Sequence, residues 1–335
     1  MVDTPRKMKY VRLGKSRLKV SKIVLGCMSY GTSDWNPWIL DEGESSVNIK
    51  KCVSVYDLGI TTFDTANMYS NGDSEIVLGK AIKKFNIPRA NIVVMTKVYF
   101  PVKKVMNNFS PLTEDAYVNQ RGLSRRHIFD SIKASLERLQ LDYVDVLQCH
   151  RFDYETPIGE TMQALHDAVQ QGLVRYVGMS SSWAYQPTVC NLDYAIANKL
   201  TPFSEMMPTL KHLGIGCIPW SPLARGYLSR PWPTGDDAAN KTAREETDRF
   251  SGLYKNMSPE ITQRVQELAE KKGVSVSQIA LAWVMSKDFV TAPIIGVTDI
   301  KKLEDSIGAI RVELTPEEVE YLEEKYTPRE VYAFQ

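Results

Sequence analysis

The sequence predicts an α/β fold, a TIM-type β/α barrel with an N-terminal hairpin, formed as one domain over residues 1–335. Short apolar runs alternate with amphipathic helical patterns, and crossovers of about 30 residues favour parallel pairing of the strands. The first run leads into residues 26–31, GCMSYG, which lack the G-x-G-x-x-G of a Rossmann dinucleotide unit. Polar residues follow several runs directly, and active residues of a barrel lie at the C-terminal ends of its strands.

The elements can be justified in chain order. Residues 9–14 and 17–26 predict a hairpin that turns near Gly14. Most of the later apolar runs are apolar on both faces, as strands of a parallel sheet under helices must be. The strand candidates are residues 22–26, 61–65, 92–98, 144–149, 175–180, 215–220 and 290–296.

Helical patterns lie between these runs. Residues 124–140 predict a helix with one apolar stripe, formed by Ile128, Ile132, Leu136 and Leu139. Residues 258–273 predict another helix, which opens with Ser258 as the cap and Pro259 in the first turn and ends at Gly273.

A β/α barrel needs eight strands, and the sequence shows one fewer. Only residues 199–204 separate a helical pattern that ends near Asn198 from the next one, which begins near Glu205. This stretch contains Pro202 and is too short for a central strand with both of its loops. The sixth strand is therefore expected to be missing, unless residues 199–204 are drawn into the gap.

Composition favours a small-molecule partner. The net charge of +1 gives no field that attracts nucleic acid or an anionic membrane, and no apolar run is long enough to span a bilayer. The N-terminus lacks the apolar stretch of a signal peptide. Five scattered cysteines without a C-x-x-C pair indicate reduced thiols and a cytoplasmic protein, and no metal site is expected (Cys27, Cys52, Cys149, Cys190, Cys217). The oligomeric state stays open.

Four polar residues at strand ends predict the reduction of a carbonyl group: Asp64, Tyr69, Lys97 and His150. Reduction requires a hydride on carbon and a proton on oxygen. A phenol such as Tyr69 can give the proton if a cation lowers its pKa, and Lys97 is that cation. Lys97 lies in an apolar strand and needs a carboxylate partner, for which Asp64 is the obvious candidate. His150 can then orient the carbonyl oxygen.

Each of these residues also has a simpler interpretation. Asp64 can cap a turn, Tyr69 can be a half-buried surface aromatic, and Lys97 can extend to solvent. A lone histidine such as His150 is more often a hydrogen-bonded structural residue than a catalyst. The occurrence of all four at consecutive strand ends favours the functional interpretation.

The sequence resembles the aldo-keto reductases. Residues 63–75 and 78–79 look like the family signature, and the likeness continues nearly throughout the chain, through residues 95–97, 148–153, 172–180, 220–226 and 293–296. Within the family it is most similar to the fungal aryl-alcohol dehydrogenase-like group, with which it shares residues 119–124.

The resemblance implies that Tyr69 is the general acid, that Lys97 and Asp64 tune it, and that His150 orients the carbonyl. It also implies NADP, as NADPH bound in extended form across the barrel mouth. Lys302 and Thr298 suit the 2′-phosphate, which favours NADP over NAD. The positions that match cofactor contacts are Gly26, Met28, Asp64, Ser180, Ser181, Trp220, Ser221, Pro222, Leu223, Ala224, Gly226, Gly296, Thr298, Lys302, Asp305 and Ser306. The backbone amides of residues 220–226 are expected to be free for the pyrophosphate.

The chain departs from the family in two places. Ser181 stands where the family usually has Asn. Between Phe203 and Ser204, family members carry a further segment that forms the sixth strand and supplies a Gln and a Tyr for the nicotinamide. Loss of a central strand removes apolar side chains that contribute about 1.5–3 kcal/mol each, against a net stability of about 5–15 kcal/mol. Impaired activity or impaired folding is therefore expected.

Aromatic residues near the strand ends predict a flat, aromatic aldehyde or ketone as substrate, although each can equally anchor a loop. They are Trp35, Trp38, Tyr99, Phe100 and Phe152. Two other functions remain open. One is a non-catalytic module that senses the nucleotide, as in the potassium-channel β subunits that share this fold, and the other is a defective isoform.

Overall fold

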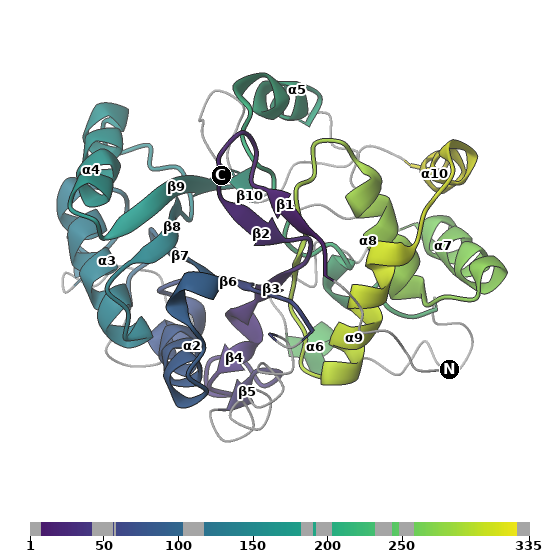
Figure 1. Cartoon of the computed structure of the whole chain (residues 1–335), viewed down its shortest axis with the longest axis horizontal. Coiled ribbons are helices and arrows are strands. Elements are labelled where there is room, and N and C mark those ends of the chain that lie inside the picture. The colour runs from purple at the N-terminus through teal and green to yellow at the C-terminus, as the bar shows by residue number, and fades with distance from the viewer. Residues whose placement is uncertain are drawn as a thin grey trace.

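The computed structural model describes residues 8–41, 56, 58–102, 117–181, 190–191, 203–231, 243–247 and 258–326. Strands form the centre and helices lie around them (Figure 1). The main sheet has seven strands in the order β10, β9, β8, β7, β6, β3, β11, and every neighbouring pair is parallel. Their bounds are β3 Val24–Gly26, β6 Thr62–Asp64, β7 Val93–Val98, β8 Val144–Cys149, β9 Val174–Ser180, β10 Cys190–Asn191 and β11 Ile294–Ile295.

The sheet continues beyond β11 through two isolated parallel bridges. Cys217 pairs with Val290, and Trp220 pairs with Ile294. The predicted strand at 215–220 thus lies in its expected place beside β11, although it makes only these two bridges. Within the described ranges no ladder joins residues 217–220 to β10, so the pairing does not close the sheet.

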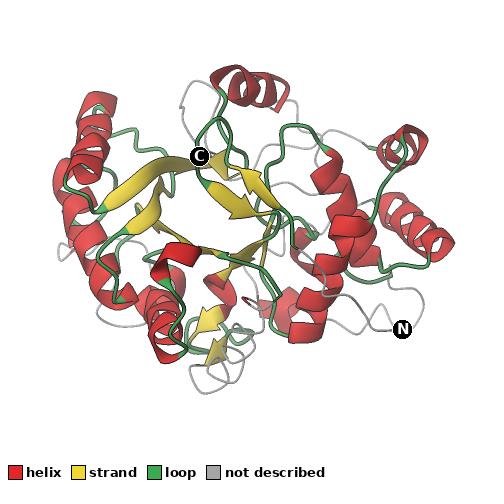
Figure 2. Cartoon of the chain, viewed as in Figure 1, coloured by secondary structure: helices red, strands yellow, loops and turns green. Residues whose placement is uncertain are grey.

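An antiparallel hairpin formed by β1 (Tyr10–Arg12) and β2 (Lys19–Ser21) precedes β3, as predicted. It lies across the centre of the strands in Figure 2. Its Leu13 and Val20 belong to a buried cluster with side chains from β3, β7, β8, β11, the segment just before β11 and the 217–220 segment: Val24, Val93, Met95, Val146, Ile218, Ala292 and Ile294. Side chains from strands so far apart in the sheet order meet only if the sheet is strongly curved. The hairpin therefore packs on the concave side.

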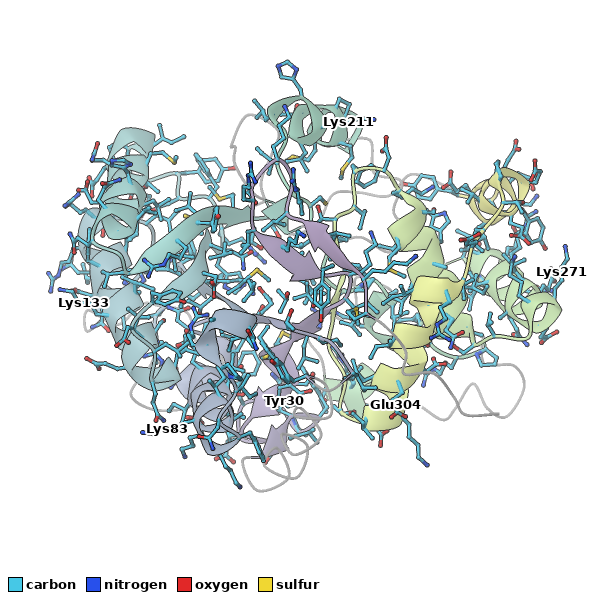
Figure 3. The ribbon with its side chains drawn as sticks, in the orientation of Figure 1. Tyr30, Lys83, Lys133, Lys211, Lys271 and Glu304 are labelled. Atoms are coloured by element: carbon cyan, nitrogen blue, oxygen red, sulfur yellow. The ribbon has the colours of Figure 1, made fainter. Side chains whose placement is uncertain are left out.

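Helices cover the outside of the sheet. They are α2 Asp73–Lys84, α3 Arg125–Leu139, α4 Ile158–Gln170, α5 Phe203–Leu213, α6 Ala243–Thr247, α7 Pro259–Lys272, α8 Val276–Ser286, α9 Ile300–Gly308 and α10 Pro316–Glu323. The predicted stripe of α3 is buried, from Ile128 to Leu139. The exposed faces carry charge: Lys83, Lys133, Lys211, Lys271 and Glu304 point outward in Figure 3.

Helix ends follow the local sequence, with one exception. The Ser124 hydroxyl caps α3 by accepting from His127 N, and Gly273 ends α7 in the left-handed region at φ 65°. Ser258 is the N-cap residue of α7, but its side chain makes no capping hydrogen bond. The prediction of a Ser258 side-chain cap was therefore wrong; Pro259, at the first turn, has no amide that needs a partner.

The sixth position of the sheet differs from the prediction. The helical pattern before Asn198 contains a strand, β10, and Cys190 and Asn191 pair with Met179 and Ser180 of β9. An unpaired strand edge leaves amide and carbonyl groups without partners, and this pairing satisfies part of the β9 edge. Ser204 belongs to α5, while residues 199–202 lie outside the described residues.

A second short pairing was not predicted. β4 (Tyr30–Gly31) and β5 (Leu40–Asp41) form a two-stranded parallel sheet that follows the first central strand. No helix in the described part of the chain is both long enough and apolar enough to cross a membrane.

Two helical glycines give a test of packing between α2 and α3. A Cβ on Gly79 would lie 2.4 Å from the Leu139 carbonyl oxygen, whereas a Cβ on Gly159 meets nothing within 4 Å. We expect Gly79→Ala to lower the free energy of unfolding by about 1–3 kcal/mol through overpacking. Gly159→Ala, the matched control in α4, should leave it unchanged or raise it by up to about 1 kcal/mol. Urea denaturation measures both, and equal effects would contradict the close helix contact.

Candidate active site

The residues at the C-terminal ends of the strands lie side by side. The register places Gly26 beside Asp64, Asp64 beside Met95, and Lys97 beside Gln148. Side chains alternate along a strand, so Lys97 shares the concave face with Val93 and Met95, and Gln148 shares it with Val146. Three adjacent strands thus direct Asp64, Lys97 and Gln148 to one point.

Lys97 is the centre of the site. Its Nζ donates to Asp64 Oδ2 at 2.6 Å, to the Thr65 carbonyl at 2.8 Å and to Tyr69 Oη at 3.3 Å. Gln148 Nε2 donates to the other Asp64 oxygen at 2.9 Å. Lys97 is 3% exposed, and the carboxylate partner predicted for it is present. A buried ammonium with all three donors used has one stable orientation.

Tyr69 lies in a turn that has unusual backbone geometry. It begins the short helix η2 (Tyr69–Gly72), in which Ser70 and Asn71 have φ of 47° and 54°. Ser70 is buried against Gly31, where a Cβ would lie 2.2 Å from Ser70 Oγ. Only glycine fits at position 31, because any larger residue would push this turn away from the strands.

The ionisation states suit a proton donor beside a fixed cation. Burial raises the pKa of Tyr69; the Lys97 ammonium acts in the opposite direction but does not outweigh burial. Lys97 thus lowers the pKa of Tyr69, as expected, but burial, which the sequence did not reveal, has the larger effect and leaves the net pKa raised. Burial lowers the pKa of Lys97, but the Asp64 carboxylate and the Tyr69 hydroxyl raise it, and the net pKa lies above the ordinary value. At neutral pH the phenol keeps its proton and the amine keeps its charge.

His150 completes the group. Its amide donates to the Val98 carbonyl at 2.8 Å, which extends the pairing of β8 with β7. Its ring lies edge-on to Tyr69, with centroids 5.7 Å apart, and edge-on to Phe100 at 5.3 Å. Burial, followed by the charges of Arg151 and Lys97, holds its pKa well below the usual range. Its Nδ1 has no hydrogen-bond partner in the described part of the chain. The imidazole is therefore neutral.

Of the predicted aromatic residues, Trp35 and Phe100 lie against the rings of Tyr69 and His150, and the others lie further away. Trp35 lies 6.5 Å from the Tyr69 ring, centroid to centroid, and Phe100 contacts His150 as above. Tyr99 packs on Phe100 at 5.0 Å, and Phe152 packs on Tyr154 at 4.8 Å. Trp38 lies under the Arg244 guanidinium at 4.4 Å. Trp35 and Phe100 thus contact the rings of the reacting group, while Tyr99 joins through Phe100.

The first cofactor-matching positions lie where β3 meets β6 and β11, beside Asp64. A Cβ on Gly26 would lie 2.9 Å from Ile294 Cγ2, so glycine at this position lets β3 and β11 pack closely, whereas a Cβ on Gly296 would make only ordinary contacts, at 3.5 Å or more. Met28, in η1 (Cys27–Ser29), is half-buried next to them. On the other side, Met179 pairs with Cys149, which places Ser180 next to His150. Ser181 has φ 47°, and its buried hydroxyl has no hydrogen-bond partner in the described part of the chain.

The loop over residues 220–226 lies on the far side of Ile294. Ser221, Ala224, Arg225 and Gly226 all have positive φ, and Pro222 and Leu223 complete the turn. The amides of Ala224 and Gly226 already donate to the carbonyls of Ser221 and Leu223, so the expectation of free amides was wrong for these two. Sequence reasoning left out Arg225, whose guanidinium lies 5.7 Å from the Trp220 ring and brings a positive charge to the loop.

The four positions around α9 differ in character. Lys302 is exposed in the first turn, and Thr298 is half-buried just before the helix. Asp305 accepts from Ser275 Oγ at 2.7 Å and from Gln278 Nε2 at 2.8 Å, which ties α9 to α8. The Ser306 hydroxyl donates to the Lys302 carbonyl. Lys302 and Thr298 are therefore accessible from outside, whereas Asp305 and Ser306 bond within the protein.

Sequence reasoning missed Gln148, the second partner of Asp64. The signal was present, because Gln148 is a polar residue in an apolar strand and precedes His150 by the two-residue period of one strand face. No group of three or more potential metal ligands occurs among the described residues.

Comparisons with known proteins show the family of this chain. A sequence profile described as "Aldo/keto reductase family" matches residues 22–327. The chain belongs to the aldo/keto reductase family. Among its family relatives is the versiconal hemiacetal acetate reductase of Aspergillus parasiticus, 45% identical with 97% of this chain and 99% of the relative covered.

Two further family relatives carry less specific names. An aldo-keto reductase of Metarhizium robertsii is 41% identical, with 97% of this chain and 93% of the relative covered. A candidate aryl-alcohol dehydrogenase of Schizosaccharomyces pombe is 41% identical, with 95% and 96% covered. The resemblance to the fungal aryl-alcohol dehydrogenase-like group is thereby confirmed. The alignment with the Aspergillus reductase has 352 positions, more than the 335 residues of this chain, so that family member carries residues that have no counterpart here.

The neutral state of His150 predicts how stability depends on pH. The unfolded chain takes up a proton at this residue near its ordinary pKa of about 6.5, and the folded chain does not. The free energy of unfolding should therefore fall as the pH drops below about 6.5, by up to about 1.4 kcal/mol per unit for one proton. Denaturant unfolding between about pH 5 and pH 8 measures this.

His150→Asn is the matched comparison, because burial also lowers the pKa of His127 and that contribution remains in the variant. The difference between the two proteins isolates His150. The same pH dependence in both would contradict a neutral, buried imidazole.

Proposed function

We propose that this aldo/keto reductase uses NADPH to reduce aromatic aldehydes or ketones to alcohols. The observation that carries the proposal is the position of Lys97 Nζ, which contacts both Asp64 Oδ2 and Tyr69 Oη beside a neutral His150. The proton donor Tyr69, the fixed cation Lys97 and the neutral ring of His150 would then surround the carbonyl oxygen of a bound substrate. This arrangement serves proton transfer to oxygen in the course of a reduction.

The protein groups have separate roles in this proposal. Tyr69 gives its phenolic proton to the carbonyl oxygen, and Lys97 stabilises the phenolate that forms. Asp64 and Gln148 hold Lys97 in place, and the neutral His150 orients the oxygen before transfer. NADPH, when bound, supplies the hydride to the carbonyl carbon, so that hydride and proton together convert C=O to CH–OH.

The cofactor is proposed to lie along the strand ends. Gly296, which is exposed and has no side chain, leaves room for it. Ser180 and the Ser181 hydroxyl, which has no hydrogen-bond partner among the described residues, suit its carboxamide. Arg225 and the 220–226 turn suit the pyrophosphate. Thr298 and Lys302 suit the 2′-phosphate, which favours NADP.

The proposed substrate is aromatic because of the rings around the reacting pair. Trp35 lies beside Tyr69, Phe100 lies beside His150, and Tyr99 extends the surface behind Phe100. Flat rings pack well against such walls. Phe152, further out with Tyr154, is proposed to contact only larger substrates. Three described cysteines are buried and form no disulfide with one another, which supports a cytoplasmic location (Cys27, Cys149, Cys217).

We further infer that residues 1–335 form one β/α barrel whose sixth position is held by β10. The curvature of the sheet and the concave cluster under the hairpin support the barrel. The excess of aligned positions over the residues of this chain supports the loss of a segment. A strand of two residues offers less surface to the nicotinamide than a full strand with its Gln and Tyr. Slow turnover is therefore expected.

A second candidate function, nucleotide binding without turnover, follows from the same shortened strand. A cofactor held mainly through its adenosine half would bind without a productive hydride geometry. Titration of the protein with NADPH, followed by an assay with benzaldehydes, separates the two. Tight binding without oxidation of NADPH would favour the second function, and a melt without a cooperative transition would indicate a defective chain.

Tyr69→Phe tests the acid. We expect it to lower the rate of NADPH oxidation with benzaldehydes by about 10²–10⁴-fold, because the phenyl ring has no proton to give. Tyr143→Phe is the control: Tyr143 lies just before β8, at the end of that strand opposite to His150, and its ring still stacks on Arg89 and Arg175. Undiminished turnover in Tyr69→Phe would rule out the proposed mechanism.

Lys302→Ala tests the choice of cofactor. Loss of one charge-assisted contact of about 1.5–3 kcal/mol should weaken NADPH binding by about 10–150-fold and leave NADH binding unchanged. Lys301→Ala is the control, since Lys301 is an exposed lysine in the same helical turn. Calorimetric titration gives the constants. Equal weakening of both cofactors, or a similar loss in Lys301→Ala, would contradict a 2′-phosphate contact at Lys302.

A further inference from the structure

Glu75 is a fully buried carboxylate that the proposed mechanism does not use. It lies in the first turn of α2 and has no exposed surface. Its Oε1 accepts from Thr96 Oγ1 at 2.5 Å, and its Oε2 accepts from Arg138 Nε at 2.7 Å. A buried charge is stable only with such partners, so this group joins α2, α3 and β7.

Both partners of Glu75, Thr96 and Arg138, lie next to residues of the active site. Thr96 directly precedes Lys97 on β7, and because strand side chains alternate, Thr96 faces the helices while Lys97 faces the concave side. Arg138 reaches the end of the Tyr69 turn, since a Cβ on Gly72 would lie 2.9 Å from Arg138 Cδ. Glu75 itself follows Tyr69 by six residues. One carboxylate therefore anchors both segments that supply the Lys97–Tyr69 contact.

The Tyr69 turn needs such an anchor. Ser70, Asn71 and Gly72 all have positive φ, and for the two non-glycine residues this conformation costs about 1–2 kcal/mol each. A strained turn persists only where its surroundings fix it. Ser74 adds a second anchor, because its hydroxyl donates to the Cys27 carbonyl at 2.8 Å. The Lys97 Nζ–Tyr69 Oη distance of 3.3 Å is long for a hydrogen bond, so a small displacement of the turn would break it.

We propose that Glu75 is a positioning residue which, through Thr96 and Arg138, sets the separation between Lys97 Nζ and Tyr69 Oη. The proposal rests on the proposed function only in treating Tyr69 as the acid. The change in the pKa of Tyr69 distinguishes a positioning role of Glu75 from a purely electrostatic one, because the two roles predict changes of opposite sign. If the turn moves away from Lys97, the influence that lowers the pKa of Tyr69 is lost and that pKa rises further. If Glu75 acted only through its negative charge, its removal would lower the pKa of Tyr69.

Thr96→Val is the sharpest variant, because it removes one hydroxyl, keeps the shape of the side chain and changes no charge. Titration of ¹³C-labelled tyrosine by NMR, with the Tyr69 signal assigned from Tyr69→Phe, gives the pKa directly. We expect a rise of about half a unit or more in Thr96→Val and in Glu75→Gln. If the wild-type protein is active, kcat should fall by about 10-fold while KM for the aldehyde stays the same.

Thr62→Val is the matched control. The Thr62 hydroxyl is buried and accepts from the Ser21 amide at 3.0 Å, at the hairpin side of the sheet. Its loss removes one buried hydrogen bond but should not move the pKa of Tyr69. Thr96→Ser, which keeps the hydroxyl, should retain the wild-type value. Arg138→Met tests the same connection from the helix side, although loss of its positive charge also favours a higher pKa. Glu75→Gln therefore replaces Thr96→Val if that variant does not fold.

A Tyr69 pKa that is unchanged or lowered in folded Thr96→Val, Glu75→Gln or Arg138→Met would overturn the proposal. A rise of the same size in Thr62→Val would also overturn it, since any lost hydrogen bond would then have the effect. The titration needs no turnover. A wild-type protein that fails to reduce benzaldehydes but shows the expected shifts would contradict the proposed function and leave the role of Glu75 supported.

Discussion

The buried contact between Lys97 and Asp64 is the constraint on which the site depends. An ammonium that is 3% exposed is stable only because a carboxylate lies 2.6 Å away and a backbone carbonyl accepts a second hydrogen bond from it. Removal of one partner from such a pair typically costs about 3–5 kcal/mol. The geometry that Tyr69 needs is thus fixed by the same interaction that keeps the concave side of the sheet stable.

The two faces of β7 carry two separate charged groups. On the concave side, Lys97, Asp64 and Gln148 form the charged centre. On the helix side, Thr96, Glu75 and Arg138 form a second charged group on the opposite face of the strand. Because adjacent residues of one strand belong to the two groups, a change in the packing of α2 on α3 reaches the active site without any contact to the ligand.

The strands with long apolar runs could be predicted from the sequence, and the short ones could not. β7 and β8 coincide with their predicted runs to within a residue, since six consecutive buried residues leave a clear pattern. β10 has two residues, lies in a segment with a helical pattern, and exists through its pairing with β9. The Tyr69 pKa shows the same limit: the sequence shows a nearby lysine, but the depth of burial, which outweighs it, is a property of the fold.

The sequence by itself determined the long strands and the helices between them, the hairpin, and the choice of Asp64, Tyr69, Lys97 and His150 as candidates, because each depends on residue type and short-range spacing. Only the tertiary structure decided that Gln148 holds Asp64, that Asp305 bonds to Ser275 and Gln278, and that Glu75 connects Thr96 with Arg138. These contacts join residues far apart in the chain. Their partners are chosen by sheet register and helix packing, which no local pattern encodes.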